Sequence, residues 1–339
     1  MKQSHFYIFI VVVGLIAPSV RSNDYQKALI DCYFEQIDKG DNSRQVNEVK
    51  DYCKEQLHRE IVQKPNKELT PLDKRIINER TALENPNVIT SHNRNYMLPI
   101  TYASHPNKAV YENAPGKLDK LDNYEAKFQI SFKAPIAQSL IKDDDVLFFG
   151  FTIQSHWQMY NSDISAPFRE TNYQPEIFYG FINDLKLGEW TNRVNMIGIE
   201  HQSNGRSQPL SRSWNRIYAN FIWENDRWII GFKPWYRIPE DEKEEPGASE
   251  GDDNPDIEKY MGHFELSTLY KWEEQTFSLM VRNNLRSENR GALQLDWTFP
   301  LGSRFKGYAQ YFNGYGESMI DYNHSIERFG IGILLTDFF

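Results

Sequence analysis

The sequence predicts an all-β fold, a twelve-stranded antiparallel transmembrane β-barrel preceded by an N-terminal helical-hairpin extension. From Tyr96 onward, apolar and polar residues alternate in short segments, as in strands with one apolar face. The segments are about ten residues long and even in number, which is typical of bacterial outer-membrane barrels. The connections between them are alternately short and long, as expected when turns lie on one side of the membrane and loops on the other.

The first 22 residues have the features of a secretory signal peptide. Lys2 precedes an apolar run from Phe6 to Ile16, and small residues follow near Val20 and Ser22. This run is too short for a transmembrane helix, and no later segment has eighteen consecutive apolar residues. We therefore expect residues 1–22 to be removed on export.

Residues 23–63 are predicted to form a disulfide-linked helical hairpin. Apolar residues recur at helical spacing in two runs, with residues 40–42 as the turn between them. Cys32 and Cys53 each lie on one of these apolar stripes. In an exported protein a disulfide between them is favoured, and two buried free thiols are the alternative. The polar segment 64–94, which contains several prolines, is interpreted as a linker.

The barrel domain is predicted over residues 95–339. Its strands are expected near residues 95–102, 124–135, 145–157, 174–183, 193–203, 213–224, 226–238, 260–272, 276–286, 290–299, 303–313 and 325–337. Pro99 interrupts the first of them, and a proline within a strand is typical of an edge or a bulge. Alternation of this kind also occurs in soluble β-sandwiches, so alternation alone does not decide the architecture.

The lengths of the connections favour a membrane barrel. Turns after even-numbered predicted strands are short, as at Asn225 and at residues 273–275. Those after odd-numbered strands are longer and include residues 158–173, 204–212, 239–259 and 314–324. With the N-terminus in the periplasm, the longer loops would face outward.

Composition argues against one class of partner and suits another. The net charge of −9 argues against nucleic acid, which a binding protein meets with clustered positive charge. The chain has eight Trp, 19 Tyr and 21 Phe, which suits aromatic girdles at two membrane interfaces. The residues expected to be interface anchors are Trp157, Trp223, Trp228 and Trp235.

The run HQSNGRSQPLSRSWN places three chemically useful side chains together. His201 and Ser203 are two residues apart in a predicted strand, so their side chains point the same way. If the chain turns back in a hairpin centred on Gln208, Asn215 lies directly opposite His201. A base, a nucleophile and an amide that orients the base would then converge.

The position of this group also favours a functional role. His201 and Ser203 share their strand face with Ile199, and Asn215 shares its face with Ile217, so all three would face lipid near the outer rim. Polar groups that face hydrocarbon are costly and rarely accidental. A His-x-Ser pair alone would carry little weight, and it is the whole run that indicates catalysis.

The sequence resembles the outer-membrane phospholipase A family, also called detergent-resistant phospholipase A. The resemblance extends from about Asn95 to Phe339. It rests on HQSNGRSQPLSRSWN and on SAPFRETNYQPE at 165–176, KPWYRI at 233–238, DDNPDIEKYMG at 252–262 and GYGESMIDYN at 314–323. It implies a twelve-stranded barrel in the bacterial outer membrane, with an active site toward the outer leaflet. It also implies calcium-dependent phospholipase A1/A2 and lysophospholipase activity on membrane phospholipids, in a homodimer.

The resemblance assigns roles to individual residues. Ser203 would attack an acyl ester, His201 would take and return the proton, and Asn215 would hold the imidazole tautomer. Asparagine carries no charge, so a further source of positive potential would be useful near the oxyanion, and calcium can supply it. By the family pattern, the carbonyl of Arg206 and the groups of Ser211 bind calcium in one subunit.

The same pattern assigns the remaining calcium ligand to Ser165 of the other subunit. Carbonyls, hydroxyls and waters are acceptable ligands for calcium, which takes six to eight oxygens. The backbone N–H of Ser203 and a calcium-bound water would form the oxyanion site. Gly205 suits the sharp turn that leaves the strand.

Other interpretations stay open. A non-enzymatic barrel, either a porin or a relative that has lost catalysis, is the main alternative, although no triad position is substituted and a twelve-stranded barrel has a narrow lumen. A soluble secreted esterase is the third, disfavoured by Phe339, which ends an alternating strand. Arg212 and Arg216 are expected to be outer-rim cations that meet anionic headgroups. The acidic stretch 240–256 resembles a calcium site, but a solvated loop is preferred because charge runs in loops are most often solvated. The sequence identifies no periplasmic partner for the extension.

Overall fold

The computed structural model describes residues 32–36, 48–49, 52–53 and 69–337, apart from 86, 113–119, 143, 246–247, 249 and 303–304. Contacts divide the chain into two units, residues 1–67 and 68–339. The larger unit is all-β apart from short helices. In the part of the chain that is described, no helix combines the length and the hydropathy needed to cross a membrane.

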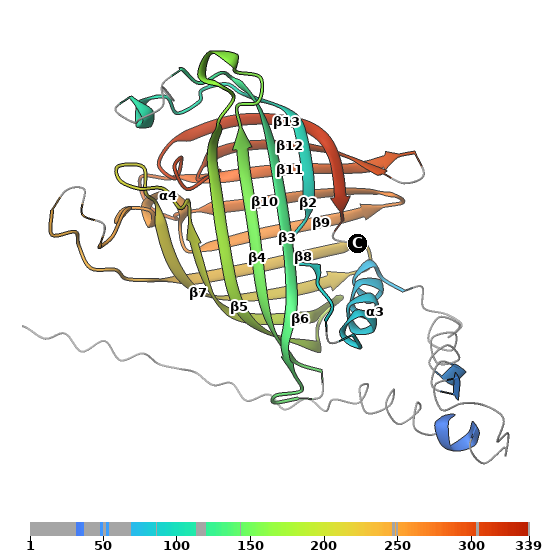
Figure 1. The fold of residues 1–339 in the computed structure, drawn as a ribbon. Coiled ribbons are helices and arrows are strands. Elements are labelled where there is room, and N and C mark those ends of the chain that lie inside the picture. Colours follow the sequence, from blue (N-terminus) through green and yellow to red (C-terminus); the bar gives the residue numbers. More distant parts are fainter. Residues whose placement is uncertain are drawn as a thin grey trace, which may run out of the picture. The chain divides into compact units, whose positions relative to one another are not determined.

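Twelve antiparallel strands close into a barrel, as predicted. They are β2 (Asn95–Ala103), β3 (Tyr124–Gln138), β4 (Val146–Trp157), β5 (Phe168–Leu187), β6 (Trp190–Ser203), β7 (Ser213–Asn225), β8 (Trp228–Ile238), β9 (Phe264–Trp272), β10 (Gln275–Asn283), β11 (Gly291–Leu301), β12 (Phe305–Tyr315) and β13 (Ser325–Thr336). Each strand pairs with the next along the chain, and β13 pairs with β2, which closes the wall (Figure 1). A two-residue strand, β1 (Thr90–Ser91), also pairs with β3.

The first barrel strand is present despite its proline. Pro99 lies where the β2–β3 register shifts, between Leu98 and Thr101. The missing N–H of proline is tolerated there because the ladder is already irregular.

The two faces of the wall differ as a membrane barrel requires. Ile197 and Ile199 of β6 are 55% and 58% exposed, whereas Lys127 and Glu200 are fully buried in the lumen. Lipid tails accept apolar side chains, and the polar side chains instead pair with one another inside. One predicted anchor is wrong: Trp235 points inward, packs edge-on against Trp214 and donates to the carbonyl of Gly262. Its even-numbered neighbour Tyr236, at 64% exposure, faces outward instead.

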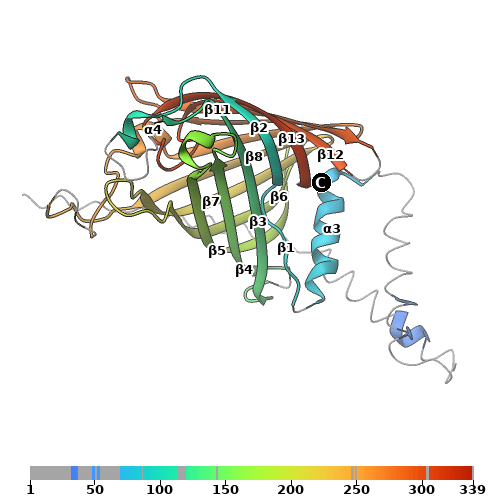
Figure 2. The same cartoon turned by 45° about the horizontal axis from the view of Figure 1, so that its top comes forward.

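The longer loops gather at one end of the barrel, as predicted. They follow β2, β4, β6, β8 and β12, and the one after β8 contains helix α4 (Glu258–Met261). Short 3-10 turns, η1 (Ala109–Tyr111) and η3 (Ser162–Ile164), lie in two of the others. Figure 2 shows α4 at the end of the barrel opposite to α3 (Pro71–Leu83).

The segment interpreted as a linker contains this folded helix. Thr70 and Asp73 form a reciprocal capping box at its start. Leu72 is buried in one cluster with Ile222, Ile229 and Leu269, and Glu79 pairs with Lys133 of β3 at 2.9 Å. The helix is polar because its partners inside the barrel are charged side chains. Its composition therefore resembles that of a linker although it is packed.

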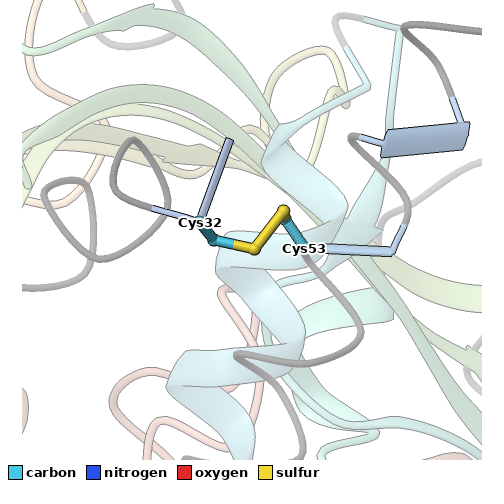
Figure 3. Close-up of a disulfide and its surroundings, with 2 residues drawn as sticks. All are labelled: Cys32 and Cys53. Carbon is cyan, nitrogen blue, oxygen red and sulfur yellow. A yellow bond between two sulfur atoms is a disulfide. The ribbon is translucent and has the colours of Figure 1, made fainter. Parts of the chain in front are cut away.

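Residues 32–36, 48–49 and 52–53 of the smaller unit are helical. Cys32 and Cys53 form a disulfide with their Cα atoms 5.8 Å apart (Figure 3). Cys53 is buried among Cys32, Tyr33 and Val49. The favoured disulfide is therefore confirmed, and the alternative of two free thiols is wrong. The signal peptide and the rest of the predicted hairpin lie outside the described residues.

Candidate active site

The β6–β7 pair brings His201 and Asn215 directly opposite each other. The predicted register is confirmed, with His201 facing Asn215 and Ser203 facing Ser213. The N–H of Asn204 donates to the carbonyl of Arg212 at 3.0 Å, so alternation of the ladder makes 201/215 a non-hydrogen-bonded pair. Side chains lie closest together in pairs of this kind, which favours direct contact between the ring and the amide.

That contact fixes the state of the imidazole. His201 Nδ1 lies 2.9 Å from Asn215 Oδ1. A carbonyl oxygen only accepts, so Nδ1 carries the hydrogen and donates it. In the neutral ring Nε2 is then the free acceptor. This is the tautomer that a general base requires.

Ser203 ends β6 on the same face as His201, and both side chains are half-buried. Among the hydrogen bonds of the described residues, none joins the Ser203 hydroxyl to the His201 ring. Such contacts are commonly long without substrate and tighten when it binds. The chain turns sharply at Gly205, where φ is +62°, and a Cβ there would lie 3.2 Å from the ring of Tyr173. The glycine expected at this turn is therefore favoured by the backbone conformation, and a Cβ there would require the Tyr173 ring to shift slightly.

The loop of residues 204–212 has a fixed form. The side-chain oxygen of buried Asn204 accepts from the backbone N–H groups of Arg206 and Arg212, at 3.3 and 3.0 Å. Its amide nitrogen donates to the carbonyl of Leu210 at 2.8 Å. One side chain thus holds both ends of the segment that carries Arg206 and Ser211, the predicted calcium ligands.

The acidic loop after β8 is solvated in part, as expected, since Asp241, Glu242, Glu244 and Glu245 are exposed, but Asp253 is half-buried and packs against this segment. Asp253 accepts hydrogen bonds from Ser211 Oγ and from Gln208, and Lys243 lies 2.7 Å from its carboxylate. Burial opposes ionisation of Asp253, but the hydrogen bonds from Lys243, Ser211 and Gln208 outweigh it and hold its pKa below the usual range. Specific partners therefore hold the part of the loop around Asp253 against the 204–212 segment.

A second carboxylate from the same loop reaches the site. Asn215 Nδ2 donates to Glu240 Oε1 at 3.1 Å. Burial and the neighbouring Asp252 raise the pKa of Glu240, against the opposing hydrogen bond from Asn215. Sequence reasoning missed this residue. The signal was present, since Asn215 faces Ile238 of β8, and residue 240 continues the outward row of 236 and 238.

Ser165, the third predicted calcium ligand, lies on the neighbouring loop between β4 and β5. It follows η3 with φ +63°, and its N–H donates to the carbonyl of Ser162. Ile164 and Leu210 belong to one buried cluster, so this loop and the 204–212 loop share a core. The contribution of Ser165 to a partner chain stays a prediction. Over the described residues, no group of three or more His, Cys, Asp or Glu side chains forms a metal site.

Behind the site, on the lumen side of the same strands, lies a buried ionic cluster. Glu200 pairs with Arg216 and, at 2.7 Å, with Lys233. The Arg216 guanidinium lies 4.0 Å from the ring of Trp214. The expectation that Arg216 is an outer-rim cation is therefore wrong. Arg212 donates to the carbonyls of Pro209 and Ser211 within its own loop at the rim, and its contact with headgroups stays a prediction.

Comparisons with known proteins identify the family of this chain. The family model described as phospholipase A1 matches residues 72–335, from the start of α3 to the end of β13. The chain belongs to the phospholipase A1 family. Members of this family are ester hydrolases, and the closed twelve-stranded barrel is that of an outer-membrane protein.

Curated relatives match over most of the barrel. Phospholipase A1 of Klebsiella pneumoniae is 39% identical over 259 residues, which are 76% of this chain and 85% of the relative. Phospholipase A1 of Escherichia coli K12 is 38% identical and is covered to 84%.

Solved structures of the phospholipase A1 family agree with the fold. Outer membrane phospholipase A from Escherichia coli matches with a TM-score of 0.68 and 36% identity, covering 74% of this chain and all of that one. The Salmonella typhi outer membrane phospholipase, described as a dimer with bound calcium, matches with a TM-score of 0.68 and 38% identity. It covers 75% of this chain and 94% of its own. An active-site variant of the Escherichia coli protein matches as well, with a TM-score of 0.71.

Proposed function

We propose that this protein hydrolyses acyl esters of glycerophospholipids at the outer rim of the barrel, with Ser203, His201 and Asn215 as its catalytic triad. The observation that carries the proposal is the 2.9 Å contact between His201 Nδ1 and Asn215 Oδ1 on a lipid-facing strand pair. An imidazole held in one tautomer beside a serine is the arrangement of serine hydrolases. Its outward direction makes a membrane lipid the accessible substrate.

The steps follow from the positions of the side chains. Ser203 Oγ attacks the ester carbonyl while His201 Nε2 takes the hydroxyl proton. The ester C–O bond then breaks, and His201 returns the proton to the departing lysophospholipid oxygen. Water repeats the sequence on the acyl-serine and releases the fatty acid. The imidazolium formed in each half donates to the neutral amide of Asn215, which orients it but adds little charge stabilisation.

Calcium is the proposed cofactor, and the nearby donors are of the kind it prefers. The carbonyl of Arg206, the hydroxyl of Ser211 and the carboxylate of Asp253 are all oxygen ligands. Asp253 touches Ser211 but is paired with Lys243, so a cation would have to compete with that ammonium group. A bound calcium ion would supply positive potential near the oxyanion, where the backbone N–H of Ser203 is also expected to donate.

A homodimer is the proposed active form, and Ser165 is its proposed contribution to the partner's calcium site. The Salmonella typhi relative, described as a dimer with bound calcium, supports a dimer and a calcium site, and Ser165 is assigned to that site by the family pattern. Sharing a cation between two chains would make dimer formation a condition for activity. Two-chain dependence is testable by diluting active protein with Ser165→Ala protein and following cross-linking and activity together.

The domain boundaries predicted from the sequence are proposed here with one change, at the start of the barrel unit. The signal peptide at 1–22 and the hairpin at 23–63 stay proposals, and the family match extends the barrel unit back to α3. The mass of the purified protein, measured with and without reductant, checks both signal removal and the disulfide.

Fatty-acid release from phospholipid–detergent micelles tests the function. We expect release with calcium, none with excess chelator, and none from Ser203→Ala. Ser213→Ala is the matched control, because Ser213 faces Ser203 from the next strand and should leave release unchanged. If folded, dimeric protein released nothing in calcium, the barrel would have kept the motif without its activity.

A further inference from the structure

The amide of Asn215 lies between two partners that together allow it only one orientation. Its oxygen faces His201 Nδ1 at 2.9 Å, and its nitrogen faces a carboxylate oxygen of Glu240 at 3.1 Å. A carboxylate only accepts, so the NH₂ end of the amide must face it. The oxygen end is then directed at the imidazole. A flipped amide would set two acceptors against each other and a donor against the Nδ1 hydrogen.

Glu240 is held where this contact requires it. Asn215 faces Ile238, the last residue of β8, and Glu240 follows two residues later on the same outward row. The backbone of its loop is fixed in turn, because the N–H of Asp252 donates to the carbonyl of Asp241 at 2.8 Å. Glu240 is half-buried, so its carboxylate is partly screened from water.

The contact also changes the charge balance of the site. A neutral asparagine orients imidazolium without offsetting its charge, whereas a carboxylate on the other side of the amide adds a negative charge to the site. Hydrogen bonds in series polarise one another, so the amide oxygen becomes a better acceptor when its NH₂ group donates to a carboxylate.

We propose that Glu240 is a positioning residue of the active site, which orients the Asn215 amide and stabilises the imidazolium of His201 through it. The proposal rests on the proposed function of His201 and Asn215. Glu240 touches neither substrate nor reacting atoms. Its effect should therefore fall on kcat and on the ionisation of His201, and not on lipid binding.

The test compares Glu240→Ala, Glu240→Gln and Glu240→Asp with the natural protein in mixed micelles containing calcium. Glu244→Gln is the control, since Glu244 is an exposed acid four residues further along the same loop. We expect Glu240→Ala to lower kcat by about tenfold, the lower end for groups that orient a reacting side chain, with KM within twofold. Glu240→Asp should recover part of the loss. Glu244→Gln should change neither quantity.

A pH profile separates orientation from charge. Because the variants Glu240→Ala and Glu240→Gln lack the negative charge behind the amide, the acid limb of kcat should move to lower pH in both. Glu240→Gln keeps an oxygen that can accept from Asn215, so it should retain more of kcat than Glu240→Ala. A carboxylate that only anchors the loop would leave the acid limb in place.

Labelling of His201 by diethyl pyrocarbonate, followed by mass spectrometry across pH, gives a second readout that needs no turnover. If the natural protein hydrolysed nothing, the proposed function would fail, and the labelling would still decide the role of Glu240. A common labelling midpoint in natural protein and both neutral variants would overturn the proposal. So would a change confined to KM. Folding of each variant is checked by the mobility of unheated samples in SDS gels.

Discussion

Alternate residues of β6 and β7 face either lipid or the lumen. The proposed catalytic residues lie on the lipid side, where side chains form fewer hydrogen bonds and ion pairs with one another. His201, Ser203 and Asn215 point outward, are half-buried, and are joined to one another by a single hydrogen bond. Their immediate neighbours Glu200 and Arg216 point into the lumen and are buried in an ionic cluster. The same strand pair therefore carries a lightly connected reactive group on one side and a densely connected support on the other.

The difference shows how a site on a lipid-facing surface can be kept in shape. The hydrogen bonds that orient the outward side chains are few: His201 contacts Asn215, and Asn215 contacts Glu240. The lumen cluster connects β6, β7 and β8 through Glu200, Arg216 and Lys233. Strands fixed from behind present their outward side chains at constant spacing, which is the support that a preorganised site requires.

The largest expected effect comes from a substitution in the lumen cluster. Glu200→Gln leaves Arg216 and Lys233 without their shared carboxylate in a buried position, and we expect it to lower the free energy of unfolding by about 3–5 kcal/mol. His201→Ala, one residue away on the outward face, should change stability little but lower kcat by about 10²–10⁴-fold. Urea unfolding in detergent micelles and fatty-acid release measure the two quantities.

Equal loss of stability in the two variants would contradict the comparison, because the outward face would then be as strongly coupled to the fold as the lumen. A second control is Glu240→Gln, whose partner is a neutral amide and whose loss strands no buried cation.

The sequence was sufficient for the wall of the barrel and for the register of the site. Period-two alternation defines a strand and its two faces, and a hairpin fixes which residues oppose each other, so His201 and Asn215 could be paired in advance. The predictions for Arg216 and Trp235 were wrong because residue type was given more weight than the alternation of the two faces along a strand. Position 216 shares its face with Trp214 and Tyr218, so alternation alone places it in the lumen.

Other features depend on contacts that alternation does not encode. Helix α3 resembles a linker because its polar residues pair with lumen charges from distant strands, as Glu79 does with Lys133. Glu240 can be matched with Asn215 only when the two-residue turn at 226–227 is placed correctly, since an error there changes which residue of β8 faces Asn215. The partners of Asp253 belong to loops whose approach is set by the closed barrel.

An effect of intermediate size is expected at Gly205, in the turn beside Ser203. Gly205 and Gly188 both have positive φ, +62° and +61°, so alanine at either position should cost about 1–2 kcal/mol of backbone strain. Only Gly205 has a neighbour, with Tyr173 3.2 Å from the position of a Cβ, while the position at Gly188 is open. We therefore expect similar unfolding free energies for the two variants but loss of hydrolysis in Gly205→Ala alone. Full hydrolysis by Gly205→Ala would mean that the turn does not determine the geometry of Ser203.

The smallest expected effect concerns the rim loop, whose charges are more exposed than those of the lumen. The pKa of Asp253 is held below its usual range, burial being outweighed by hydrogen bonds from Lys243, Ser211 and Gln208. A carboxylate with a lowered pKa stabilises the fold above its unfolded value, and that contribution is lost as the pH falls through the folded value.

Below about pH 4, therefore, the loop after β8 should detach and become sensitive to an acid-active protease while the barrel stays intact. Asp253→Asn should already be sensitive to a second protease, active at neutral pH, and should lose the dependence on pH. Asp241→Asn, at an exposed position in the same loop, should behave as the natural protein does. If cleavage of the natural loop did not change across this range, the contacts of Asp253 would contribute nothing to holding the loop over the site.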